Sequence, residues 1–167
     1  MSDTGSTYRI CHIELDEKTI IRRNADIDHE RRVAIFDLLE NNSYQPLVAL
    51  PDDYAGPFRV ILRMEENRLV MDIYSAHDTS QTDRLSIIAL PLTLLRKTIK
   101  EYFHICDSYF VAIKSASPRQ IETIDMARRG LHNEGSEILQ ERLSEKVKMD
   151  FHTARRLFTL ICVLQIR

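Results

Sequence analysis

Apolar and polar positions alternate with a period of two through much of the first half of the chain, which is the pattern of half-buried β-strands. We predict four such strands, over residues 8–15, 58–64, 69–74 and 84–90. The middle two are separated by a short turn only, which predicts a β-hairpin with one apolar face. In the first and the last strand, the apolar side chains that share a face are Cys11, Ile13 and Leu15, and Leu85, Ile87 and Ala89.

In the second half, apolar residues recur every three or four positions, which indicates amphipathic helices. Pro91 suits the first turn of a helix that we expect to run to about Ser115. Ser117 caps the next helix, with Pro118 in its first position, and Gln120 completes a capping box. These signals predict two long helices joined by a very short connection.

Gly135 lies inside the second of these helices. The apolar pattern continues through it to about residue 145, so we favour one long helix. The alternative is an end at Gly135 and a restart capped by Ser136. A short strand is expected over residues 146–149, and Asp150 then begins the last helix.

One helix is also expected between the first two strands. Asp28 caps it, and it covers residues 29–41, with Val33, Phe36 and either Leu39 or Glu40 at helical spacing. Residues 43–57 are predicted to form a loop.

The order of elements predicts the fold class. Strands come mainly first and helices mainly later, and the strand connections are too short for repeated βαβ crossovers. We therefore predict a single α+β domain over residues 8–167, with a mainly antiparallel sheet packed by long C-terminal helices. Residues 1–7 are predicted to form a disordered tail.

Composition narrows the classes of function. The formal net charge of −2 lacks the basic excess typical of nucleic-acid-binding proteins, so we do not expect nucleic acid as a partner. No apolar run approaches the roughly 20 residues that cross a bilayer, and no signal-peptide core precedes the first strand. We therefore expect a cytoplasmic protein without membrane contact.

Motifs for phosphate, dinucleotide, zinc-peptidase, nucleophile-elbow and EF-hand chemistry do not occur in the chain. Cys11, Cys106 and Cys162 are far apart and form no CxxC pair, so we expect three free thiols, all of them buried. We predict no cofactor and no metal.

The most unusual segment, residues 128–137, places charges, a histidine and two glycines within a helix. Arg128 and His132 share a face, with Asp125 one turn earlier. Such a set can hold an anion or move a proton, because histidine titrates near neutrality. The candidate catalytic residues are His132, Arg128, Asp107 and Glu134. The candidate ligand-binding residues are Arg128, Arg129, Asn133 and Arg155.

A structural interpretation of this segment stays open beside the functional one. Gly130 and Gly135 would then let another helix approach closely, and Asp107 would form an ion pair with Arg128. Arginine doublets recur along the chain, at 22–23, 31–32, 128–129 and 155–156. Converging arginines would make a phosphate or carboxylate site, and solvated ion pairs are the alternative.

Four segments carry a resemblance to a known family: residues 34–43, 102–109, 121–141 and 153–162. The third is the most specific, because its polar string Arg-Arg-Gly-Leu-His-Asn-Glu-Gly-Ser is rare in an amphipathic helix. Over about residues 8–165 the chain resembles uncharacterised protein family 0262, a small bacterial family. The resemblance implies a single-domain protein of the bacterial cytosol, and it implies no activity, ligand or catalytic residue.

Three functional hypotheses follow. The first is a non-enzymatic binding or regulatory module that uses a surface near the long helix, with another protein or a second copy as partner. The second is a small hydrolase or phosphate-handling enzyme built around residues 107 and 128–137. The third is RNA binding through converging arginines.

Overall fold

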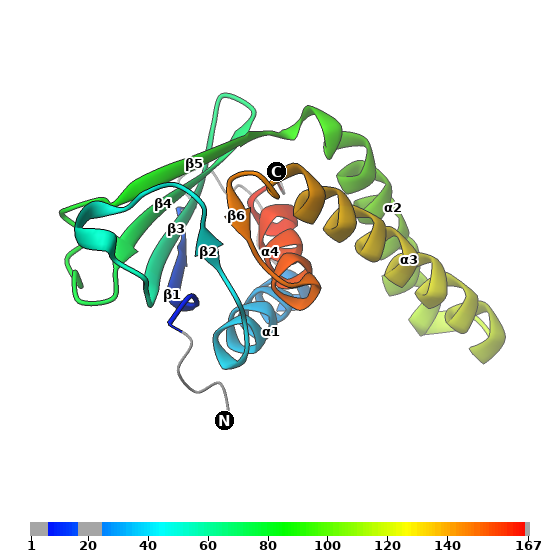
Figure 1. The fold of residues 1–167 in the computed structure, drawn as a ribbon. Helices are drawn as coiled ribbons and strands as arrows, with labels where there is room; N and C mark the ends of the chain where they lie inside the picture. Colours follow the sequence, from blue (N-terminus) through cyan, green and yellow to red (C-terminus); the bar gives the residue numbers. More distant parts are fainter. Residues whose placement is uncertain (1–6, 17–24, 166–167) are drawn as a thin grey trace.

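The computed structural model describes residues 7–16 and 25–165 and confirms the α+β class (Figure 1). The strands are β1 (Ile10–Leu15), β2 (Gln45–Pro46), β3 (Phe58–Glu65), β4 (Arg68–Ser75), β5 (Ser86–Pro91) and β6 (Val147–Lys148). The helices are α1 (Ala25–Glu40), α2 (Arg96–Ser115), α3 (Pro118–Arg142) and α4 (Phe151–Leu164). Of the predicted tail, only Thr7 lies within the described residues. Within the described ranges, none of the helices is long and apolar enough to cross a membrane.

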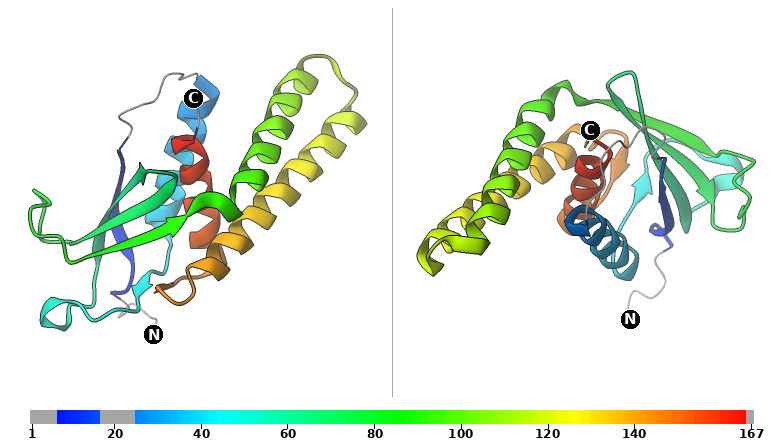
Figure 2. Two further views of the ribbon diagram at one scale, coloured as in Figure 1. Left: turned by 90° about the horizontal axis from the view of Figure 1, so that it is seen from above. Right: turned by 180° about the vertical axis from the view of Figure 1, so that it is seen from behind.

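The strands β1, β3, β4 and β5 form one sheet in that order, with the helices gathered on one side of it (Figures 1 and 2). β3, β4 and β5 run antiparallel as predicted, and the β3–β4 hairpin turns at Glu66 and Asn67. β1 instead pairs parallel with β3. A parallel neighbour needs a crossover, which α1 supplies in the long connection between these strands. The sheet is therefore mixed.

The predicted core face of β5 is wrong. Ile88 and Leu90 are buried, whereas Ile87 is exposed. Met71 of β4 pairs with Ile88, so the cross-strand register carries the core face of β4 onto the even-numbered residues of β5. Ile87 then lies on the sheet face that no helix covers.

The predicted core face of β1 needs a smaller correction. The pairing of β1 with β3 is irregular between Ile10 and His12. Ile10 therefore joins Ile13 and Leu15 in the core, whereas Cys11 is only half-buried.

Side chains cap both outer edges of this sheet. At the β1 edge, the Asn42 side chain accepts a hydrogen bond from the Ile10 amide at 2.7 Å and donates to the Ile10 carbonyl at 2.9 Å. At the β5 edge, the Lys146 ammonium donates to the Ala89 carbonyl at 2.6 Å.

α1 differs from its prediction in its start and in its buried face. It begins at Ala25, so Asp28 lies in its first turn rather than at its cap. Ala34 and Leu38 face the core, whereas Val33 is exposed and Phe36 is 64% exposed. α1 packs on α4 and on β1, and this packing, not the spacing of the larger apolar residues, decides which face of α1 is buried.

The two long helices are antiparallel and form a hairpin whose tip stands clear of the sheet (Figure 2). Pro91 ends β5 instead of starting a helix, and a short 3-10 turn leads into α2. The capping box at the start of α3 is confirmed, since Ser117 and Gln120 exchange both hydrogen bonds. α3 is continuous through Gly135, as favoured.

The C-terminal helix α4 runs through the centre of the molecule and covers the sheet together with α1 (Figures 1 and 2). The Asp150 side chain accepts a hydrogen bond from the Thr153 amide at 2.8 Å and confirms the predicted cap. Just before α4, β6 confirms the expected short strand, and it pairs with β2. β2 lies within residues 43–57, which were predicted to form a loop without a strand.

Candidate functional site

His132 projects from α3 into the junction of three helices. Its ring lies 5.3 Å from the Tyr102 ring of α2 and 5.1 Å from the Phe158 ring of α4, centre to centre and edge to face. Nε2 lies 2.7 Å from the Thr159 hydroxyl oxygen. Only 7% of the residue is exposed, so the imidazole is a buried polar group held between aromatic rings.

The hydrogen bonds around Thr159 indicate the tautomer of His132. The Thr159 hydroxyl donates to the Arg155 carbonyl at 3.2 Å, so its oxygen accepts from Nε2–H. Nδ1 then carries the lone pair, and it has no hydrogen-bond partner among the described residues. Burial, with Arg155, Arg156 and Arg128 nearby, lowers the pKa of His132 to about 4. His132 is therefore neutral at physiological pH.

Arg128 lies one turn before His132 and is held by two neighbours. Its Nε and Nη2 donate to Asp125 at 3.2 and 2.6 Å, and the guanidinium lies 4.4 Å from the centre of the Tyr109 ring. The expected ion pair with Asp107 is absent from the part of the chain that the structure describes. Asp125 is one turn away on the same helix, whereas Asp107 lines a groove elsewhere on the hairpin.

Arg128 lies near the carboxyl of Glu30 and the thiol of Cys106, and Cys162 lies near both of these groups. Burial raises the pKa of Glu30 on α1, and Arg128 partly offsets this rise. Burial also raises the pKa of Cys106 to about 11 and that of Cys162 well above its usual value. Both thiols therefore stay protonated, which disfavours a role as nucleophile. The expectation of free cysteines is confirmed.

The remaining candidate residues are distributed over several surfaces. Arg155 lies beside His132, and its Nε is buried without a hydrogen-bond partner among the described residues. Arg129 is exposed and pairs with Asp125 at 3.1 Å. Asn133 and Glu134 are exposed, and Glu134 accepts a hydrogen bond from Thr98 at 3.4 Å.

The structure thus brings Arg128, His132 and Arg155 together and leaves Asp107, Asn133 and Glu134 apart from them. The close helix approach expected at the glycines occurs at Gly135, against Phe158, but not at Gly130, which has open space around it. These positions alone do not test a chemical role for Arg128, His132 or Arg155, so that role stays a prediction.

Asp107 lines a different feature, a groove of about 840 Å³ along the outer half of the α2–α3 hairpin. Its walls combine apolar and charged side chains, among them His104, Asp107, Val111, Arg119, Thr123 and Ile124. This groove was not predicted from the sequence, although apolar residues close to the expected helix–helix turn were a usable signal.

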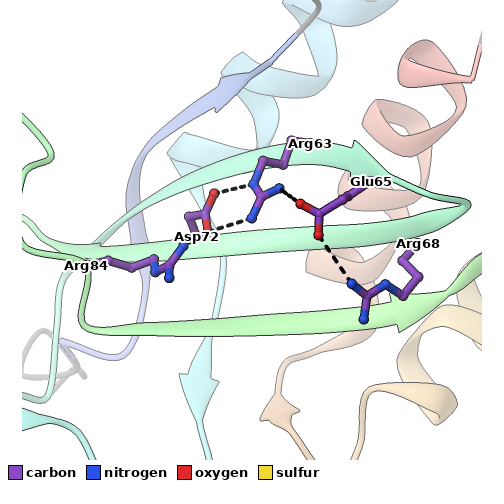
Figure 3. A network of polar contacts seen from close by, with 5 residues as sticks. All are labelled: Arg63, Glu65, Arg68, Asp72 and Arg84. Carbon is purple, nitrogen blue, oxygen red and sulfur yellow. Dashed lines mark hydrogen bonds and ion pairs between the residues drawn. The ribbon is translucent and has the colours of Figure 1, made fainter.

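A second feature that the sequence analysis missed is an ion-pair network on the uncovered face of the sheet (Figure 3). Asp72 is buried, with one carboxylate oxygen 2.7 Å from Arg63 Nε and the other 2.9 Å from Arg84 Nη1. Arg63 also reaches Glu65 at 2.8 Å, and Glu65 reaches Arg68. Since these charges pair with each other, the network supports the sheet rather than presenting an open ligand site.

Comparison with known proteins gives the family. A family model described as uncharacterised protein family UPF0262 matches residues 7–167. The chain belongs to UPF0262. A UPF0262 protein of Erythrobacter litoralis is 54% identical over 160 residues, covering 96% of this chain and 98% of the relative. One from Sphingopyxis alaskensis is 53% identical over 168 residues, covering 100% and 99%, respectively. No solved structure matches the chain.

The UPF0262 assignment confirms the resemblance, and it carries no activity. Within the described part of the UPF0262 chain, no group of three or more His, Cys, Asp and Glu side chains is placed to hold a metal. The interior cluster around His132 offers a neutral imidazole and arginine charge, whereas the hairpin offers an open groove. These are the two places that a functional proposal has to weigh.

Proposed function

We propose that the protein is a binding module whose α2–α3 hairpin is the partner-binding element. The observation that carries the proposal is the exposure of large apolar side chains on this hairpin. Val111 is 67% exposed and Met126 is 62% exposed, and Ile113 is exposed as well. Val111 lies with Ile124 in the groove of this hairpin, and apolar side chains that line a surface groove are typical of interaction sites.

The hairpin is also preorganised for binding. Its base is anchored, because His132 packs on Phe158 and a close helix approach is made at Gly135. Its tip is held by the capping box of Ser117 and Gln120. A rigid surface loses little conformational entropy when a partner binds.

Site-specific photo-crosslinking in the bacterium tests this proposal. A photoreactive amino acid replaces Val111 or Met126 on the hairpin, and replaces Ile87 on β5 as the control, because Ile87 is exposed and apolar but lies elsewhere. We expect discrete cross-linked products at Val111 and Met126 and none of the same mass at Ile87. Absence of any product at both hairpin positions would contradict the proposal.

A second candidate function is the binding of a small anion at the interior cluster. The buried Nε of Arg155, with no hydrogen-bond partner among the described residues, and the nearby Arg128 favour it. Thermal melting of the wild type and of Arg155→Gln in rising phosphate, with chloride at equal ionic strength as control, tests it. We expect a phosphate-specific rise in Tm that Arg155→Gln lacks; equal responses to phosphate and chloride would exclude this site.

We also propose that the protein works in the cytoplasm. The support is its cysteine chemistry, since Cys11, Cys106 and Cys162 are all free thiols. Fractionation of cells that express the full chain checks this, with recovery in the periplasmic fraction as the contrary result. The expectation that nucleic acid is not a partner stays a prediction.

A further inference from the structure

We infer that the protein self-associates, two copies laying the tips of their α2–α3 hairpins against each other, antiparallel, about a two-fold axis. This inference rests on the proposed function and names the partner as a second copy of the same chain. What carries it is a pair of opposite charges, Asp107 and Arg119, set apart along the hairpin groove.

The two charges stand at different distances from the tip. α2 ends at Ser115, so Asp107 lies about 12 Å from the tip at the α-helical rise per residue. Arg119 is the residue after Pro118, with which α3 begins, and therefore lies at the tip itself. The groove is thus acidic toward the body of the protein and basic at its outer end.

Neither Asp107 nor Arg119 takes part in the ion pairs found between the described residues of the hairpin. Asp125 pairs with Arg128 and with Arg129. Asp107 and Arg119 are exposed, and neither side chain makes a hydrogen bond or ion pair within the described ranges. Each is therefore available to a charge from outside the chain.

A two-fold axis matches the two charges to each other. In an isologous interface every contact occurs twice: if one residue of the first copy touches a different residue of the second copy, the same two residues also touch with the copies exchanged. When two tips overlap antiparallel, Asp107 of each copy faces Arg119 of the other, so two ion pairs form at once. A self-complementary groove of this kind favours a second copy over an unrelated partner.

The middle of the groove supplies the apolar part of the interface. Val111 and Ile124 line it at levels between the two charges. The axis then lies close to Val111, whose exposed side chain packs against its equivalent. The tip of the hairpin stands clear of the sheet (Figure 2), so an antiparallel overlap of two tips places the two bodies at opposite ends of the dimer.

The size of the overlap sets the expected strength. Two tips whose Asp107 and Arg119 face each other overlap over about 14 Å of helix, which gives an interface at or below the small end of the range for specific complexes. We therefore expect a concentration-dependent dimer, and the electrostatic part of its stability weakens with salt.

Charge exchange tests the inference on the full-length chain by sedimentation velocity over a concentration series. Asp107→Arg and Arg119→Asp each place like charges opposite each other, and we expect each to weaken the dimer at least about tenfold. An equimolar mixture of the two variants restores association as a heterodimer, and the double variant restores the homodimer. All these positions are exposed, and circular dichroism checks that the fold is kept.

Lys114→Glu and Glu122→Arg are the matched controls, since both residues are exposed on the hairpin and neither lines the groove. We expect them to dimerise like the wild type. A wild-type chain that is monomeric at every concentration overturns the inference, as does a mixture that fails to associate. Either result leaves the proposed binding function standing if Val111 still cross-links to a different protein.

Discussion

Gly135 of α3 lies directly against the ring of Phe158 on α4, and a methyl group at this position would overlap the ring. Gly135 is itself buried, and the His132 ring packs edge to face on the same phenyl group. This contact anchors the base of the helical hairpin to the central helix.

The first prediction concerns this contact. Gly135→Ala is expected to destabilise the protein by about 1–3 kcal/mol, because the added methyl overpacks the α3–α4 seam. Gly130→Ala is the matched control, since it lies in the same helix with nothing nearby. It is expected to stabilise by up to about 1 kcal/mol through helix propensity. Urea unfolding measures both, and equal effects of the two substitutions would refute the packing argument.

The second prediction is a pH dependence caused by His132. Its pKa in the folded protein is about 4, against 6.5 for the unfolded chain, so the unfolded chain binds the proton more tightly. The free energy of unfolding is therefore highest above pH 6.5, where His132 is neutral in both states. It falls as the pH drops from 6.5 to 4, by about 3 kcal/mol in all.

Unfolding free energies measured between pH 7 and pH 4 check this. His132→Gln is expected to flatten the pH dependence, whereas His104→Gln, a change at an exposed histidine, is expected to leave it as in the wild type. An unchanged slope in His132→Gln would show that other groups control the acid response.

The third prediction concerns the uncovered sheet face. Asp72→Asn removes the carboxylate charge that pairs with the guanidinium groups of both Arg63 and Arg84. Because the arginines are partly exposed, we expect a loss of about 1–3 kcal/mol. Glu65→Gln, at the exposed end of the same network, is expected to change stability little. A loss for Glu65→Gln as large as that for Asp72→Asn would contradict this account.

The fourth prediction concerns the hairpin tip. Ser117→Ala removes the side chain that accepts a hydrogen bond from the Gln120 amide, and is expected to cost about 1 kcal/mol of stability. Hydrogen exchange should be faster in the first turn of α3 in this variant. Ser115→Ala, at the end of α2, is expected to leave exchange in that turn unchanged.

Local signals account for what could be predicted from the sequence. The capping box at Ser117 and the cap at Asp150 depend on residues three apart, and both were placed correctly. The face of β5 depends instead on the pairing of Met71 with Ile88, which no local pattern contains. The same holds for α1, where exposed Val33 and Phe36 have the spacing of a core face.

The candidate site shows the same division. Spacing correctly placed Arg128 and Asp125 on one face of a helix, because that relation is local. The position of Asp107 depends on how α2 and α3 are rotated against each other, and this rotation puts it in the groove rather than beside Arg128. The convergence of Arg155 on His132 depends on where α4 crosses α3, which is likewise set by tertiary packing.

The side chains at the two sheet edges have a consequence for the behaviour of the protein at high concentration. Strands with open edges recruit other strands and lead to aggregation. The Asn42 amide occupies the outward hydrogen-bonding groups of Ile10, and the Lys146 ammonium places a charge at Ala89. Both blunt the edges against strand addition, so we expect association between copies to end at small, discrete assemblies instead of continuing into fibres.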